Sequence, residues 1–173
     1  HNCTEALFVT GERPEQKYQE AREWLKENGF SSTAEYLAHA SEMALKGGLF
    51  PHTNAGNLTK DEMRELKKTN VSMGLMLENA SERLSEKNMA HQFAPSKNPN
   101  ARIKILQNAG ELKIPMTTGL LVGIGESPFE LIDSIYAIKE IHDKYQNIQE
   151  VILQNFQPKQ DTPMKYNPSP QEK

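Results

Sequence analysis

The segment 114–130 constrains the fold most, because a strand, a turn and a helix start follow one another without a gap. An apolar run from Ile114 predicts a buried strand. After a glycine-rich turn, Ser127 is placed to cap a helix, Pro128 occupies its first position and Glu130 completes a capping box. This order is half of a βαβ unit. Such turns lie at the C-terminal ends of parallel strands, where α/β proteins bind ligands.

The turn contains Gly119, Gly123 and Gly125, whose missing side chains allow a flat ligand to approach the backbone. A dinucleotide fingerprint is excluded, since its third glycine position is occupied by Pro128. A P-loop is excluded as well, because no lysine follows the glycines. Two interpretations remain. The turn either receives adenine or a similar flat group, or it is a glycine-rich barrel corner that binds nothing.

Strands and helices are expected to alternate along the whole chain, which predicts a parallel sheet with helical crossovers. Strands are expected at 5–10, 49–54, 71–77, 114–122 and 148–156; helices are expected from Pro14, Ser32 and Thr59, around 81–84, over 103–109 with a stop at Gly110, and over 131–142. The Ser32–Glu35 and Thr59–Glu62 pairs predict two further capping boxes.

Five strands at roughly 31 residues per barrel unit account for about 155 residues. Five parallel strands cannot close a ring, so the sheet is either open and doubly wound or part of a barrel. We expect an α/β fold of the second kind, an incomplete (β/α) TIM-type barrel. Residues 1–156 would form about five β/α units, and 157–173 a proline-rich tail or a connection to a further part.

Composition excludes several classes of function. The 173 residues include 20 basic and 23 acidic side chains, which gives no electrostatic case for nucleic acid or an anionic membrane as partner. No apolar run approaches the roughly 20 residues that span a bilayer. One cysteine, Cys3, excludes an internal disulfide framework and favours a cytoplasmic protein. It also means that no multi-cysteine metal site is expected from this chain.

Five stretches together resemble the radical S-adenosylmethionine (SAM) enzymes and, more narrowly, the family that forms the deazaflavin chromophore FO. The matching stretches are CTEALFVTGERPE (3–15), GLFPHTNAG (48–56), SMGLMLENASERL (72–84), KIPMTTGLLVGIGE (113–126) and IQEVILQNFQPKQDTPM (148–164). The glycine turn is shared widely among radical SAM enzymes, whereas GLFPHTNAG followed by SMGLMLE is far narrower.

The resemblance implies a radical SAM core with the cofactor lying across the C-terminal strand ends. Its SAM-binding residues would be Gly11, Glu12, Glu78, Lys97, Gly119, Leu121, Gly123 and Glu126. Gly11-Glu12 would receive the methionine amino group, and the strand from Gly119 would pack on adenine. The resemblance assigns Glu126 to bracing the turn. Lys97 would pair with the methionine carboxylate, with Arg83 or Arg102 as alternatives.

The chain departs from the family pattern at three places. Thr10 replaces the usual first glycine, and Leu121 stands where isoleucine is common. The family's [4Fe–4S] cluster is held by C-x-x-x-C-x-x-C, which this chain lacks. The expected cofactors are therefore SAM and a cluster whose ligands are not in this chain, and we interpret the sequence as an interior fragment of the enzyme.

The family's reaction implies a small-molecule substrate, the adduct of a tyrosine-derived hydroxybenzyl group with a ribityl diaminouracil, which is cyclised with loss of ammonia. It also implies a tyrosine-activating radical SAM partner, either a separate subunit or a fused domain. Candidate substrate residues are His52 and Asn54, for which anchoring a loop is the less favoured alternative, and Gln154 and Asn155, which a polar strand end would explain equally well. No catalytic residue is assigned.

Two other classes of function are compatible with the sequence. A non-radical barrel lyase or aldolase would need a lysine or a pair of carboxylates at the strand ends. A catalytically inactive scaffold that binds a nucleoside would need neither, and it would explain the missing cluster cysteines.

Overall fold

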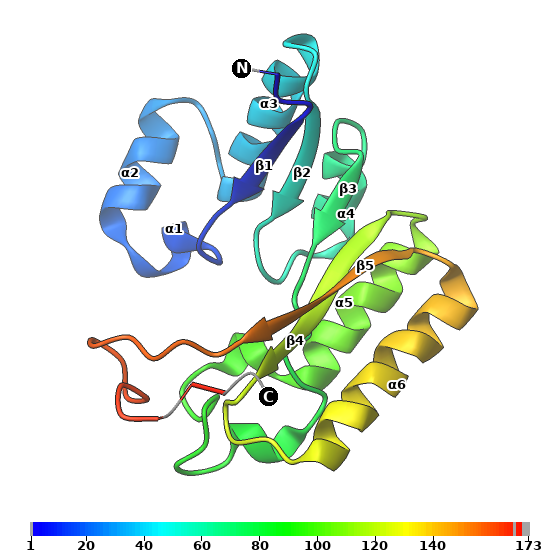
Figure 1. The fold of residues 1–173 in the computed structure, drawn as a ribbon. Coiled ribbons are helices and arrows are strands. Elements are labelled where there is room, and N and C mark those ends of the chain that lie inside the picture. The colour runs from blue at the N-terminus through cyan, green and yellow to red at the C-terminus, as the bar shows by residue number, and fades with distance from the viewer. Residues whose placement is uncertain (1, 168, 171–173) are drawn as a thin grey trace.

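The computed structural model describes residues 2–167, 169 and 170, which form one sheet of five parallel strands. The strands lie in chain order: β1 (Glu5–Val9), β2 (Phe50–Asn54), β3 (Ser72–Gly74), β4 (Met116–Val122) and β5 (Ile148–Asn155). A doubly wound sheet reverses its strand order at a switch point. This sheet has no reversal and does not close, so the predicted incomplete barrel is confirmed (Figure 1).

The helices that follow the strands form a single layer on one face of the sheet (Figure 1). This layer contains α3 (Thr33–Lys46), α4 (Lys60–Leu66), α5 (Pro99–Glu111) and α6 (Pro128–Tyr145). Short elements occupy the loops: α1 (Pro14–Lys17), α2 (Gln19–Glu27), and the 3₁₀ helices η1 (Glu82–Ser85) and η2 (Pro95–Lys97). We call the side of the sheet away from α3–α6 the open face.

The apolar core lies between the sheet and this helical layer. Leu37 of α3, Leu66 of α4 and Leu106 of α5 are buried there against Met73 and Leu120 of the strands. Because strand side chains alternate between faces, these core positions leave their neighbours in β3 and β4 on the open face. Every second residue of these strands therefore lies on the open face, where it could contact a ligand.

The helix starts follow the predicted capping chemistry closely. Both halves of the capping box are present at Thr59–Glu62 and at Ser127–Glu130. The capping box predicted at Ser32–Glu35 forms only in part. Ser32 accepts a hydrogen bond from the backbone N–H of Glu35 at 3.2 Å, but the Glu35 carboxylate binds Ser31 instead of reaching back to Ser32.

Two predicted helix boundaries are also wrong. The helix from Pro14 breaks at Tyr18, whose extended backbone separates α1 from α2. Gly110 does not end its helix, because α5 continues to Glu111. Instead, the missing Cβ of Gly110 allows the ring of Tyr145 to pack against the α5 backbone. The glycine marks close contact between α5 and α6.

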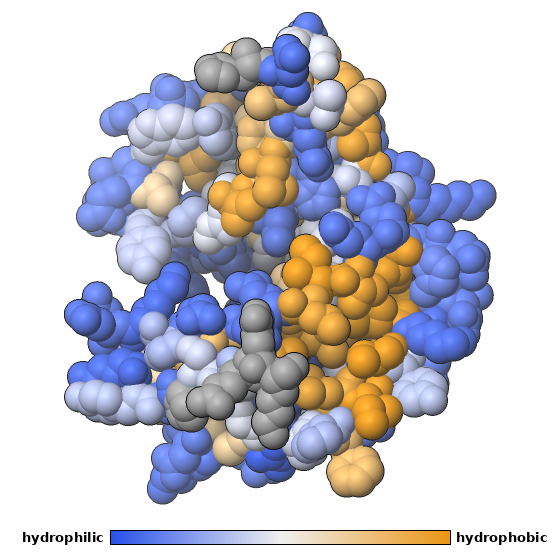
Figure 2. All heavy atoms as spheres, viewed as in Figure 1, coloured by the Kyte–Doolittle hydropathy of each residue, from blue (hydrophilic) through white to orange (hydrophobic). Residues whose placement is uncertain are grey.

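Two exposed apolar areas remain at the outer strands (Figure 2). Leu7 and Val9 project from β1, and Leu153 projects from β5. Beside β5, α6 exposes a stripe that includes Phe129 and Tyr136. None of the helices in the described ranges has the length and apolarity needed to cross a membrane.

Candidate cofactor and substrate site

Glu78 lies at the C-terminal rim of the sheet, at the end of the segment that continues β3. Its backbone has φ 65°, the left-handed conformation that a non-glycine residue rarely adopts. Two backbone hydrogen bonds to β4 stabilise this conformation. Glu78 donates its N–H to the oxygen of Gly119 at 2.8 Å, and its own oxygen accepts the N–H of Leu121 at 3.0 Å. These bonds fix the carboxylate beside the predicted glycine turn.

Three cationic or polar side chains converge on the Glu78 carboxylate. His91 Nε2 lies 3.0 Å from Oε2, Arg102 lies 3.3 Å from Oε1, and the Lys97 ammonium donates to the same Oε1. Burial disfavours the charged carboxylate, but the hydrogen bonds from His91 and Lys97 and the nearby charges outweigh it and lower the pKa of Glu78 to about 2. The group is therefore an anion at neutral pH.

Of the three basic candidates for the methionine carboxylate, Lys97 and Arg102 lie in this rim cluster, and Lys97 is the more accessible of the two. Its side chain is 33% exposed, whereas that of Arg102 is 6% exposed. Arg102 also donates to the backbone oxygens of Met76 and Ser96. Arg83 has a structural role, because it pairs with Glu130 and donates to the oxygen of Gly125 at 2.9 Å.

Glu12 belongs to the same rim. Its carboxylate accepts the backbone N–H of Asn57 at 3.1 Å, and the Asn57 amide donates to the oxygen of Ser96. Ser96 in turn accepts from Arg102, which contacts Glu78. A continuous polar network therefore joins the loop after β1 to the loop after β3. The neighbouring Gly11 is exposed, with its backbone open.

The glycine turn is held in shape by Glu126, as the family resemblance implied. Its two carboxylate oxygens accept the backbone N–H groups of Gly123 and Ile124, at 2.7 and 2.8 Å. Gly123 and Gly125 have φ values of 94° and 102°, a region that favours glycine. Glu126 is consequently occupied with the turn itself.

Gly119 has a different role, since its strand geometry is ordinary. A Cβ at this position would overlap the backbone oxygen of Ile152 and come within 2.5 Å of Met76 Cε. The glycine thus permits close contact between β4, β5 and the Met76 side chain. Two residues on, Leu121 lies on the same open face and is partly exposed.

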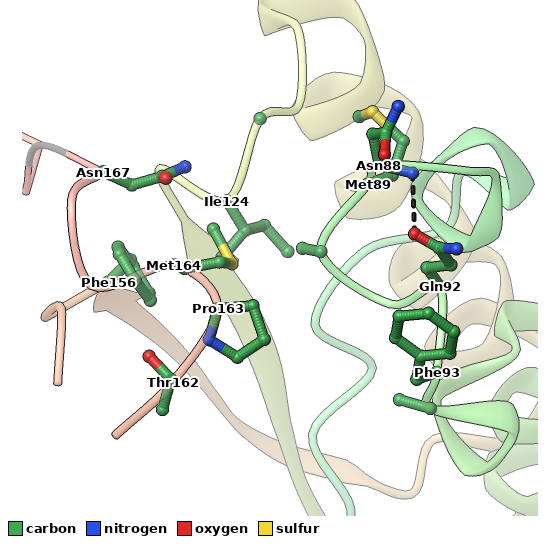
Figure 3. Close-up of a pocket in the computed structure, with 13 residues that line it drawn as sticks. Asn88, Met89, Gln92, Phe93, Ile124, Phe156, Thr162, Pro163, Met164 and Asn167 are labelled. Atoms are coloured by element: carbon green, nitrogen blue, oxygen red, sulfur yellow. Dashed lines mark hydrogen bonds between the residues drawn. The ribbon is translucent and has the colours of Figure 1, made fainter. Parts of the chain in front are cut away.

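A cavity of about 740 Å³ opens beside the turn (Figure 3). Met89 and Phe93 line it from the loop after η1, Ile124 from the turn, and Phe156 and Met164 from the chain beyond β5. In Figure 3 these mostly apolar side chains surround a common space. The volume is within the range of small-molecule sites.

The four candidate substrate residues do not lie together. His52 and Asn54 both flank Gly74 on the open face, and His52 lies one layer deeper than the rim. Gln154 lies opposite Leu121 and shares the open face. Asn155 alternates to the other face, with Val151 and Leu153. Three of the four therefore share a face with the rim.

Sequence reasoning missed His91 and Asn57. His91 is 7% exposed and contacts Glu78 from a loop of turns, where no periodic pattern indicates which side chains point inward. Asn57 acts through its backbone N–H as well as its side chain, and GLFPHTNAG ends just before it. In the sequence, Asn57 could have been found only from its position directly after GLFPHTNAG.

Known proteins provide an independent comparison. The chain is 48% identical over 169 residues to the 7,8-didemethyl-8-hydroxy-5-deazariboflavin synthase of Methanopyrus kandleri, covering 97% of this chain and 51% of that protein. It is 52% identical over 171 residues to the protein of the same name from Methanocaldococcus jannaschii, covering 97% and 47%. Along nearly its whole length, the sequence matches proteins named 7,8-didemethyl-8-hydroxy-5-deazariboflavin synthase. The resemblance seen in its motifs is confirmed.

The chain spans about half the length of these curated relatives. Two solved structures share its fold: methylornithine synthase (PylB), with a TM-score of 0.65 at 14% identity, and HydG, a maturase of the [FeFe]-hydrogenase, with 0.65 at 17%. Each match covers 78% of this chain, and 37% and 32% of the respective solved chains. A scan against family models gave no match.

Proposed function

We propose that this chain forms the SAM- and substrate-binding part of a radical SAM synthase that closes the deazaflavin ring. The observation that carries the proposal is the Glu78–Lys97 ion pair at the rim, joined by backbone hydrogen bonds to the glycine turn. It places a charged pair suited to the methionine end beside a bare backbone suited to adenine. The names of the relatives supply the product, 7,8-didemethyl-8-hydroxy-5-deazariboflavin, and the family resemblance supplies the ring-closing step.

The residues present fit SAM. Its carboxylate would pair with Lys97 and its ammonium with Glu78 or the Gly11-Glu12 backbone, while adenine would lie against Leu121 and Gly123. The cavity beside Ile124 leaves space for a flat group at this point. When bound, SAM would supply the hydrogen-abstraction chemistry of the proposed reaction. The role of this chain is to orient both molecules and exclude water.

The residues present do not fit a [4Fe–4S] cluster. Such clusters need several cysteine thiolates, and the sequence has only Cys3, which is exposed. The described residues also contain no group of three potential metal ligands. The cluster ligands would therefore have to come from outside this chain, and no step is assigned to the cluster here.

The proposed substrate is the hydroxybenzyl adduct of a ribityl diaminouracil, cyclised with release of ammonia. Asn54 and Gln154 face the open side of the sheet, where they would contact it, while Asn155 faces away. The adduct would be supplied by a tyrosine-activating radical SAM partner, fused or separate, and the protein would act in the cytoplasm.

An aldolase-type reaction receives less support from this site. Schiff-base chemistry needs a lysine with a neutral amine. Lys97 is bound to the Glu78 carboxylate, so its amine is not free to attack a carbonyl. SAM cleavage by the full-length protein distinguishes an enzyme from a catalytically inactive scaffold.

The test uses the natural full-length protein, purified without oxygen and loaded with iron and sulfide. We expect 5′-deoxyadenosine and a fluorescent deazaflavin when SAM, a reductant and the adduct are supplied. Glu78→Gln and Lys97→Met should each raise the apparent Kd for SAM at least tenfold. Glu111→Gln, which removes a surface carboxylate paired with Lys60, is the matched control.

Each outcome distinguishes the hypotheses. A wild-type protein that binds SAM but never cleaves it would support the scaffold. Normal SAM affinity in both variants would show that the rim pair is not the methionine site. Deazaflavin formation that needs no SAM would overturn the radical mechanism.

A further inference from the structure

The open face carries a second polar cluster, nearer the N-terminal ends of the strands than the rim. It takes one side chain from each strand, and we call it the five-strand row: Glu5, His52, Ser72, Thr117 and Glu150. No motif or spacing in the sequence groups these residues. The rim network of Glu12, Glu78 and Lys97 does not include any of them.

His52 is one of three buried members of the row, together with Ser72 and Thr117. Its Nδ1 lies 2.7 Å from Ser72 Oγ and 3.9 Å from a Glu5 carboxylate oxygen, and its side chain is 8% exposed. No described residue hydrogen-bonds to Nε2. A Cβ at Gly74 would lie 2.9 Å from that nitrogen, so the glycine leaves it uncovered. A buried imidazole therefore directs an unpartnered nitrogen over Gly74.

Thr117 lies directly beyond Gly74, because the two residues are register partners in β3 and β4. Its hydroxyl is 3.2 Å from Glu150 Oε2. The register shifts at this point: Met116 pairs with Ile148, but Thr117 pairs with Glu150. This irregularity skips Gln149 and turns the Glu150 carboxylate toward the row, as bulges beside functional sites often do.

The row consists mainly of hydrogen-bond acceptors. Glu5 and Glu150 contribute carboxylates, and burial lowers the pKa of His52 below its ordinary value despite those two charges, which favours neutral imidazole. An anionic ligand such as a phosphate would be repelled. A neutral or cationic molecule rich in hydroxyl or amino donors would be bound.

We propose that the five-strand row binds the donor-rich end of the substrate, with Thr117 and Glu150 in direct contact and His52 accepting a hydrogen bond at Nε2. The inference rests on the proposed function and extends it. It places the hydroxyl- and amino-bearing ribityl diaminouracil part deep on the open face, below the SAM rim. The carbon to be attacked then lies between the two sites.

The test compares three variants of the full-length protein: Glu150→Gln, Thr117→Val and Gly74→Ala. Gly74→Ala keeps every polar group but places a methyl group against His52 Nε2. Binding of a ribityl diaminouracil is measured by calorimetry, and the His52 imidazole is followed by ¹⁵N NMR. We expect its Nε2 resonance to shift on binding and the Kd to rise about tenfold or more in each variant, with SAM affinity unchanged.

Glu140→Gln, an exposed change on α6, is the matched control and should bind as the wild type does. Wild-type affinity in both Glu150→Gln and Thr117→Val overturns the proposal, even if Gly74→Ala fails to fold. An absence of SAM cleavage in the wild type would instead refute the proposed function. The Kd for the ribityl diaminouracil would still show whether the five-strand row binds it.

Discussion

The imidazole of His91 hydrogen-bonds to the Glu78 carboxylate at 3.0 Å, and both side chains are nearly buried. Two residues separated by an irregular loop thus meet at the rim of the sheet. Their contact holds the loop after η1 over the strand ends, where it lines one side of the cavity. The rim cluster around Glu78 and the cavity are consequently built from the same segment.

This relationship predicts how stability depends on acidity. The pKa of Glu78 is lowered from 4.5 to about 2 in the folded protein, so its contribution is present above about pH 4.5 and is lost as the pH falls toward 2. The shift corresponds to on the order of 3 kcal/mol. Urea unfolding of the wild type and of Glu78→Gln, from pH 7 to pH 3, measures the difference.

We expect the gap in unfolding free energy between these two proteins to narrow as the pH falls. Glu62 also has a pKa of about 2, but it contributes equally to both proteins and cancels in the comparison. A gap that stays constant over this range would show that Glu78 is not the stabilising anion described here.

A pair of glycine substitutions tests the packing of β4. Gly119→Ala would place a Cβ into the backbone oxygen of Ile152, so we expect a loss of roughly 2–4 kcal/mol in unfolding free energy. Gly11→Ala is the control, because nothing lies within 4 Å of the added methyl group. Its effect on stability should stay within about 0.5 kcal/mol. Equal effects of the two substitutions would contradict the close contact.

The sequence predicted the parts of the fold that depend on local chemistry. Capping at Thr59 and Ser127 follows from contacts within three residues along the chain. The bracing by Glu126, which the family resemblance implied, is equally local. The strand order could be inferred from alternation, because βαβ connections leave few topologies. These features need no knowledge of distant partners.

Features that depend on distant partners could not be predicted. Gly110 was expected to end a helix, but Tyr145, 35 residues away, determines its role. Whether Gln154 or Asn155 faces the site depends on the register with β4, which the irregularity at Thr117 sets. A single-residue change in register reverses every side chain of a strand, and composition does not reveal it.

Glu126 provides a third prediction. Glu126→Ala removes both acceptors for the N–H groups of Gly123 and Ile124, so the turn should loosen. We expect a loss of roughly 1–3 kcal/mol in stability and a higher Kd for SAM. Glu126→Gln retains one acceptor oxygen and should lie between the wild type and Glu126→Ala in both measurements. Unchanged SAM binding in Glu126→Ala would mean that the turn does not contact the cofactor.

A buried amide beneath β2 provides the last prediction. Asn70 accepts a hydrogen bond from Thr53 at 2.8 Å and donates to Ser41 at 3.0 Å, and both hydroxyl residues are fully buried. Asn70→Leu would leave these hydroxyls without their partner, so we expect the free energy of unfolding to fall by roughly 1–3 kcal/mol. Adding Thr53→Val removes one orphaned hydroxyl and should recover part of the loss. Asn28→Ala, at an exposed helix end, is the control. Chemical denaturation compares the variants; if the double variant is no more stable than Asn70→Leu alone, the hydroxyl of Thr53 does not depend on Asn70.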